Sequence, residues 1–270
     1  MLTLVSETVS ATSNGCNGLP SQDDLKTALL GAVGSSNGGL NNNMWATIVN
    51  ADGVVCAVAF SGANRKQQWL LSRVIAAQKA YTANGLSLPA GTPKGNDTEI
   101  ALSTANLNTA VNPGGSLYGL QHSNPVDPEE AYAGGPGSFG TANDPMVGET
   151  IGGVNVFGGG LGLYNAARQR VGGVGVSGDT SCADHVIAWR VRDALGLDNV
   201  PGGVAAGTDN IIFDLTSIEA SPAGAGTNTG GFNSPSGFGH PTCLGDADGP
   251  GDGDSESLGQ NLPVSNPIGP

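Results

Sequence analysis

Two of the three histidines stand where they could bind a metal ion. His185 follows Cys182 in the sequence Cys-Ala-Asp-His, in the first turn of a predicted helix. The helix dipole disfavours an imidazolium at this end, so a neutral ring would keep a nitrogen available for iron. His122 lies in a long turn-rich loop. Alternatively, His185 packs near the helix cap and His122 is a solvated loop residue. Covalent haem attachment is not expected, because the required C-x-x-C-H motif lacks its first cysteine here.

A glycine motif precedes the same helix. The segment from Gly173 to Gly178 reads G-x-G-x-x-G, and Asp198 follows about twenty residues on, as in dinucleotide-binding folds. In those folds the acid ends a second parallel strand, whereas Asp198 follows a predicted helix. We therefore expect Gly173 and Gly175 to let a helix lie close to the strand. No serine lies in G-x-S-x-G, so no catalytic residue is assigned and an enzyme is not favoured.

Four aspartates gather near the C-terminus, at positions 246, 248, 252 and 254. Their spacing with glycines could wrap Ca²⁺ in oxygen ligands, although it departs from the EF-hand template. The alternative is a solvated acidic tail.

The overall charge excludes two kinds of partner. The chain has 270 residues, 23 acidic and 10 basic side chains, and a net charge of −13. Binding to nucleic acid or to an anionic membrane surface needs clustered Lys and Arg, so neither is expected. No apolar run approaches the length of a membrane span. From Asp193 onward the chain has acids but no Lys or Arg, and this change of composition predicts a boundary near Leu197. We therefore expect a leader at 1–20, a domain at 21–197 and an acidic Gly/Pro-rich extension at 198–270.

Hydrophobic periodicity and capping signals predict the elements that would position these residues. Helices are expected after a Ser21–Asp24 capping box, over 65–84 before Gly85, over 99–111, and from Thr180 or Ser181 to Leu195, with Ser181 and Asp184 at capping-box spacing. β-Segments at 44–49 and 54–60 flank the turn Asp52-Gly53, and segments at 151–164 and 169–177 form a second hairpin. This order favours an α+β domain in which one antiparallel sheet is covered by helices on one face.

Three stretches together resemble the GlcG/HbpS-like haem-binding family. They are WATIVNADGVVCAVAF at 45–60, QKAYTA at 78–83 and VNVFGGGLGLYNAARQRVGGVGVSGDTSCAD at 154–184. The resemblance covers 21–197, and the chain departs from compact members in the long insertion at 113–150, the cysteines and the extension. It implies a single α+β domain that forms homo-oligomers and holds haem non-covalently. Six residues match the motif positions of the family: Lys79, Thr82, Gly175, Ser177, Gly178 and Asp184. Their shared role there is either in the fold or in chemistry.

From this resemblance we expect a small-molecule ligand, haem, in an exported protein that scavenges, stores or senses it. His185 or His122 would be the axial ligand, with Lys79, Arg65 or Arg73 as partners of the propionates. One alternative is an enzyme or sensor for a small hydroxy acid or aldehyde, with a polar pocket at Lys79, Ser177 and Asp184. The other is a structural or assembly protein.

The four cysteines could be buried thiols or disulfide-bonded. The acidic, lysine-poor composition, rich in Gly, Asn, Ser and Thr, is typical of an exported protein and favours disulfides. None of the cysteines forms C-x-x-C, and four cysteines allow three disulfide pairings. We expect Cys56–Cys182, joining the first hairpin to the last helix, and Cys16–Cys243, joining leader to tail. Such bonds indicate a periplasmic or extracellular site. The first ten residues lack a basic n-region and a long apolar h-region, so a signal peptide is expected to be absent or already removed.

Overall fold

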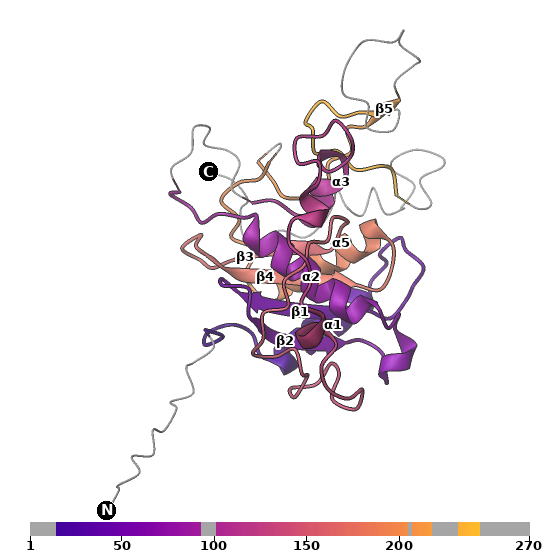
Figure 1. The fold of residues 1–270 in the computed structure, drawn as a ribbon, viewed down its shortest axis with the longest axis vertical. Helices are drawn as coiled ribbons and strands as arrows, with labels where there is room; N and C mark the ends of the chain where they lie inside the picture. The colour runs from indigo at the N-terminus through magenta and orange to yellow at the C-terminus, as the bar shows by residue number, and fades with distance from the viewer. Residues whose placement is uncertain (1–14, 93–100, 205–206, 218–231, 244–270) are drawn as a thin grey trace, which may run out of the picture.

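The centre of the molecule is a four-stranded antiparallel sheet with the strand order β2-β1-β4-β3. The computed structural model describes residues 15–92, 101–204, 207–217 and 232–243 (Figure 1). The strands are β1 (Trp45–Asn50), β2 (Val55–Phe60), β3 (Gly160–Tyr164) and β4 (Arg170–Ser177). The helices are α1 (Gln22–Val33), η1 (Arg65–Gln67), α2 (Ser72–Gly85), η2 (Thr104–Asn106), α3 (Leu107–Ala110), η3 (Leu120–His122), α4 (Pro128–Ala131) and α5 (Ser181–Ala194). A short pair, β5 (Thr216–Ser217) and β6 (Phe232–Asn233), lies in the extension.

Both predicted hairpins are confirmed, and the same local device closes each turn. The Asn50 side chain accepts hydrogen bonds from the backbone of Asp52 and Val54, both at 2.9 Å. The Asn165 side chain does the same for Ala167 and Gln169, both at 3.0 Å. An asparagine that replaces backbone acceptors in this way fixes the chain reversal locally. The second hairpin is shorter than predicted, because β3 begins only at Gly160, after a segment in which glycines at 152, 153 and 159 have positive φ.

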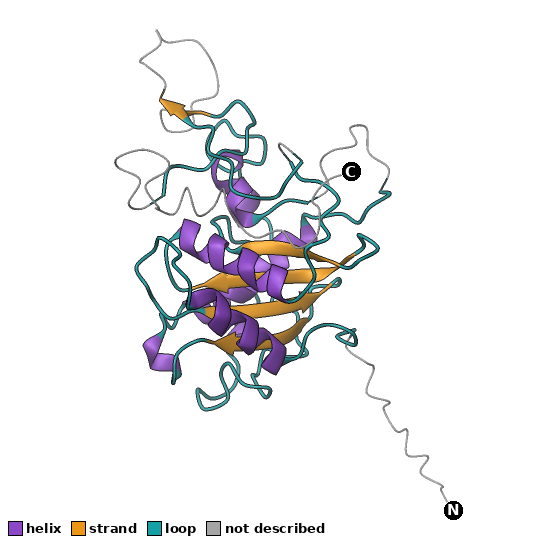
Figure 2. Cartoon of the chain, turned by 180° about the vertical axis from the view of Figure 1, so that it is seen from behind, coloured by secondary structure: helices purple, strands orange, loops and turns teal. Residues whose placement is uncertain are grey.

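Helices cover both faces of the sheet, so the expectation of helices on one face is wrong (Figures 1 and 2). The pleat of β4 explains this arrangement. Val174 and Val176 point into a core shared with α1 and α5, whereas Gly173 and Gly175 lie against α2. A Cβ on Gly175 would overlap the backbone of Ala76, so the glycines do let a helix lie close to the strand, as the sequence predicts.

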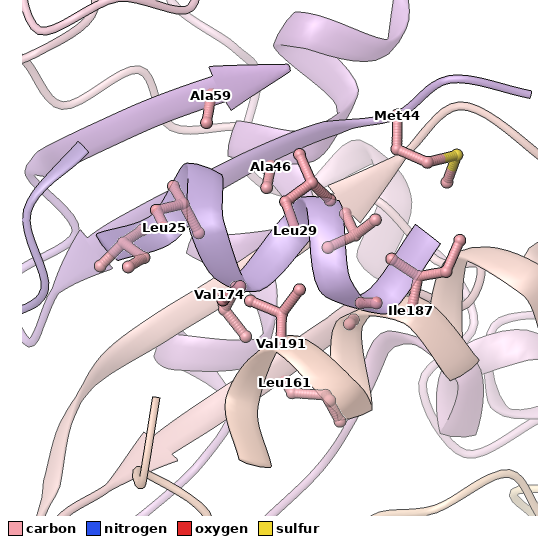
Figure 3. Close-up of a cluster of buried hydrophobic side chains, with 14 of the residues drawn as sticks. Leu25, Leu29, Met44, Ala46, Ala59, Leu161, Val174, Ile187 and Val191 are labelled. Atoms are coloured by element: carbon pink, nitrogen blue, oxygen red, sulfur yellow. The ribbon is translucent and has the colours of Figure 1, made fainter. Parts of the chain in front are cut away.

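The larger core lies between the sheet and the helices α1 and α5 (Figure 3). Leu25 and Leu29 come from α1, and Ile187 and Val191 from α5. These side chains are buried against Val174, Leu161 and their neighbours on the strands. Their spacing of four residues on each helix is the period that puts side chains on one face.

Two of the predicted helices are shorter in the structure, whereas the first and last begin where the sequence predicts. The capping box of Ser21 and Asp24 begins α1 as predicted. The helix expected over 65–84 begins as a separate 3₁₀ turn, and α2 starts at Ser72. The helix expected over 99–111 is reduced to η2 and α3, which follow a capping box at Ser103. Thr180, not Ser181, is the N-cap of α5.

The predicted disulfide pairing is wrong. Cys16 is bonded to Cys56 and Cys182 to Cys243, with Cα–Cα distances of 5.5 and 5.9 Å. The first bond holds the described end of the leader, residues 15–20, beside β2. Residues of the extension pack on the start of α5, where Cys182 and Cys243 share an apolar cluster with Ile211. No helix in the described ranges has the length and apolarity needed to cross a membrane.

Candidate functional site

A cavity of about 360 Å³ lies at the C-terminal end of α2. We call it the α2 cavity. Four segments far apart in the sequence form its walls: the end of α2, the turn after β1, the loop around η3, and the segment before β3. Its lining residues are Ala51, Asp52, Tyr81, Thr82, Asn84, Gly85, Leu86, Leu120, Ser123, Asn124 and Val154. Such a mixture of apolar walls and few polar groups is typical of a small-molecule site.

Local contacts fix the polar groups that line this cavity. Tyr81 lies over Gly53, where a Cβ would overlap the aromatic ring. Its hydroxyl accepts a hydrogen bond from the Asn124 side chain at 3.4 Å. The Thr82 hydroxyl donates to the Gln78 carbonyl at 2.7 Å and accepts from the Asn155 backbone at 3.0 Å. The walls are therefore held in place without a ligand.

Arg170 puts a positive charge behind one wall of the α2 cavity. Its guanidinium donates to the Ala51 carbonyl at 3.2 Å and to the Asn84 side chain, and both acceptors belong to residues that line the cavity. Its Nε is buried and has no hydrogen-bond partner in the described part of the chain. A buried donor without an acceptor is unfavourable, so an anionic group at this wall would be stabilised.

His122 is next in sequence to Ser123, which lines the α2 cavity, but is not itself a lining residue. It is the last residue of η3, and it is exposed. Leu120 and Ser123 of the same short segment line the cavity. Gly119, at the N-terminal end of η3, has φ of 93°, a conformation that favours glycine and lets the loop turn here.

His185 lies instead in the protein core. Its side chain is fully buried, and neither ring nitrogen makes a hydrogen bond of good geometry within the described residues. Trp189 lies beside it with 6.0 Å between ring centroids. Burial lowers the pKa of His185 to about 3, so the ring is neutral at physiological pH. The structure therefore places this histidine as a packed core residue near the helix cap.

Two of the expected propionate partners are held in buried ion pairs. Lys79 donates to Asp184 at 2.5 Å and to the Val176 carbonyl at 3.0 Å, and its ammonium lies 3.7 Å from the centroid of the Phe157 ring. Burial lowers the pKa of Lys79 and raises that of Asp184, while their mutual attraction opposes both changes. Arg73 is paired with the Asp144 carboxylate in the same way.

The polar pocket considered for a hydroxy acid or aldehyde is a filled interior. Lys79 and Asp184 are fully buried and Ser177 is 2% exposed. The family resemblance allows these residues a role either in the fold or in chemistry. In the structure, Lys79 joins α2 to β4 through the Val176 carbonyl and to α5 through Asp184. Arg65, the third expected propionate partner, lies at a different cavity near the other end of α2.

Three residues of the candidate site carried no signal in the sequence. Tyr81 has the helical spacing of a core residue, Arg170 lies in a strand, and Asn124 lies in a turn-rich loop. No group of three or more His, Cys, Asp or Glu side chains within the described ranges could hold a metal ion. The aspartates at 246–254 proposed for Ca²⁺ lie outside the described residues.

Comparison with solved structures gives four matches, two of which are described below. No family model matches the chain, and no curated protein matches it. A structure described as a PduOC:heme complex is 22% identical, with a TM-score of 0.41, and the match covers 64% of this chain and 89% of that one. The Klebsiella pneumoniae protein ORFY, of family-model DUF336, is 22% identical, with a TM-score of 0.42 and coverage of 72% and 97%. The chain itself has the α+β fold that its resemblance to the GlcG/HbpS-like family implies, one antiparallel sheet with helices.

Proposed function

We propose that this protein binds haem non-covalently at the α2 cavity, with the His122 imidazole as the iron ligand. The observation that carries the proposal is the position of His122. Its side chain is exposed, and Leu120 and Ser123 of the same segment line the cavity. His185, the other candidate ligand, is enclosed in the core. An iron ligand must be reachable by the metal, so the accessible histidine is favoured.

The residues of the α2 cavity suit the two parts of a haem molecule. Tyr81, Leu86, Leu120 and Val154 offer apolar surface to a porphyrin ring. Arg170 does not line the cavity, but its guanidinium, bonded to Ala51 and Asn84 of the wall, puts a positive charge close enough to favour a propionate there. The cavity opens to solvent, so part of a flat ligand would remain exposed. When bound, haem would supply an iron centre whose properties depend on the axial ligand and on the polarity of its surroundings.

The proposed setting is a periplasmic or extracellular one. Both disulfides support it, because such bonds persist in oxidising compartments. The role there would be scavenging, storage or sensing of haem, in a homo-oligomer as the family resemblance implies.

Titration of the purified protein with haemin tests the proposal. We expect a saturable shift of the Soret band in the unaltered protein and its loss in His122→Ala. Arg170→Gln should weaken binding by about fivefold, because it removes the positive charge behind one wall of the cavity. His185→Leu is the matched control and should keep the shift, since its side chain is inaccessible.

Two results would contradict the proposal. One is the absence of any Soret shift in the unaltered protein. The other is a shift that is the same in His122→Ala as in the unaltered protein, which would place haem elsewhere or show non-specific adsorption. A circular dichroism spectrum of each variant confirms that it is folded.

A further inference from the structure

A second cavity, of about 520 Å³, lies between two loops near the start of α2. We call it the phenylalanine groove. Its lining residues are Phe60, Ala63, Asn64, Arg65, Lys66, Pro136, Gly137, Phe139 and Thr141. It shares no lining residue with the α2 cavity. The two cavities lie beside opposite ends of β2, whose six residues span about 20 Å at roughly 3.3 Å per residue.

The charge of the phenylalanine groove is opposite to that of the whole protein. Arg65 and Lys66 are its only charged lining residues, and neither forms an ion pair within the described ranges. Behind the walls, Lys26 lies 5.1 Å from the centroid of Phe60, and Arg73 lies 3.9 Å from that of Phe139. Arg73 is neutralised by Asp144, so Lys26, Arg65 and Lys66, three of the ten Lys and Arg residues of a chain with net charge −13, give the groove its positive charge. A cleft lined by one sign of charge concentrates ligands of the other sign.

The wall that carries Arg65 and Lys66 is rigid. Asn64 and Gln67 form a capping box around the 3₁₀ turn η1. The Gln68 side chain accepts from the Gly62 backbone at 2.8 Å and donates to the Asn64 carbonyl at 2.8 Å. These contacts use amide side chains and no carboxylate, so they fix the loop without neutralising its two cations.

The wall that carries Phe139 is fixed by a single buried carboxylate. Asp144 accepts hydrogen bonds from the backbone of Gly140 at 2.7 Å and of Met146 at 3.0 Å, and from Arg73. Gly140 packs so closely on Phe60 that a Cβ would overlap the ring. Phe60 at the end of β2 and Phe139 on the facing loop are therefore held in place, with the unpaired charges of Arg65 and Lys66 beside them.

We propose that the phenylalanine groove binds a small aromatic anion, with its ring between Phe60 and Phe139 and its carboxylate against Arg65 and Lys66. Aromatic rings stack favourably on phenylalanine side chains. A carboxylate accepts charge-assisted hydrogen bonds from guanidinium and ammonium groups. The preformed walls lower the entropic cost of binding.

Isothermal titration calorimetry with 2-naphthoate tests this assignment. We expect saturable binding to one site, weakened by about fivefold in each of Arg65→Gln and Lys66→Gln, since each removes one charge-assisted contact. Phe139→Leu should weaken binding by about threefold through the loss of stacking. Arg168→Asn is the charge-matched control, because Arg168 lies in the β3–β4 turn with φ of 57°, which asparagine adopts readily.

Two uncharged or non-aromatic probes separate the parts of the proposal. Binding of 2-naphthamide or cyclohexanecarboxylate should be at least about fivefold weaker than that of 2-naphthoate. Equal binding of 2-naphthoate to the unaltered protein and to the Arg65 and Lys66 variants would overturn the assignment, as would no binding at all. Haemin titration of the same variants should be unchanged, so the two proposals fail independently.

Discussion

Three buried ion pairs join separate segments in the described part of this protein. Arg73 pairs with Asp144, Lys79 with Asp184 and Arg192 with Asp209. Breaking such a pair by removing one partner is costly, because it leaves an uncompensated charge in the interior. The cations in these pairs are therefore committed to the fold. Among the basic residues outside these pairs, Arg65 and Lys66 line a cavity and can meet a ligand.

The buried His185 should make the protein sensitive to acid. Its pKa is about 3 in the folded state, because burial disfavours the charged ring, whereas the ordinary pKa of a histidine in an unfolded chain is 6.5. Between these values the unfolded chain binds a proton that the native state does not, so stability falls as the pH drops below 6.5. At pH 4.5 the loss should reach about 2 to 3 kcal/mol relative to pH 7.

Urea unfolding of the unaltered protein and of His185→Leu at both pH values measures this effect. The variant should lose less stability on going from pH 7 to pH 4.5, whatever its stability at pH 7. An identical loss in both proteins would show that another group controls the acid response.

At the scale of elements, close contact between α2 and β4 depends on glycine. Gly173 and Gly175 alternate with Val174 and Val176 along β4, so one face of the strand is flat and the other carries side chains. The flat face accepts the backbone of α2 directly, and the other face completes the core with α1 and α5. A single strand thereby fixes the spacing of both helical layers.

Gly175→Ala should lower the free energy of unfolding by about 2 to 3 kcal/mol, because its Cβ would overlap the Ala76 carbonyl oxygen. Gly31→Ala is the matched control. Gly31 lies within α1 and has no atom within 4 Å of an added Cβ. It should raise stability by about 0.5 to 1 kcal/mol through helix propensity. Chemical denaturation compares the two, and a tolerated Gly175→Ala would show that α2 can move away from the sheet.

At the scale of the whole molecule, disulfides tie both ends of the described chain to the domain. Cys16–Cys56 fastens the leader to β2, and Cys182–Cys243 fastens the extension to the start of α5. Other contacts follow the same path: Ser181 hydrogen-bonds His240 at 2.7 Å, and Arg192 pairs with Asp209. The described parts of the extension thus contribute to the packed structure.

Peptide mapping without reductant should yield the linked pairs Cys16–Cys56 and Cys182–Cys243. The bonds span 40 and 61 residues, so each should stabilise the fold by roughly 4 kcal/mol through restriction of the unfolded chain. Replacement of either pair by serine should therefore lower the free energy of unfolding by a similar amount. Recovery of a Cys56–Cys182 peptide would contradict the structure.

The sequence alone determined the features that depend on neighbouring residues. The capping box at Ser21 began α1, the Asp52-Gly53 turn closed the first hairpin, and the glycines of β4 predicted close packing of a helix. Each of these involves hydrogen bonds or periodicity within a few positions, so local residue types suffice.

The tertiary structure decided which distant groups meet. It paired Cys182 with Cys243, placed His185 in the core, and used Lys79 and Arg73 in ion pairs. It also gathered Tyr81 and Asn124 at one cavity. These outcomes depend on how long loops pack, and a loop of many residues can close in several ways at nearly equal entropic cost.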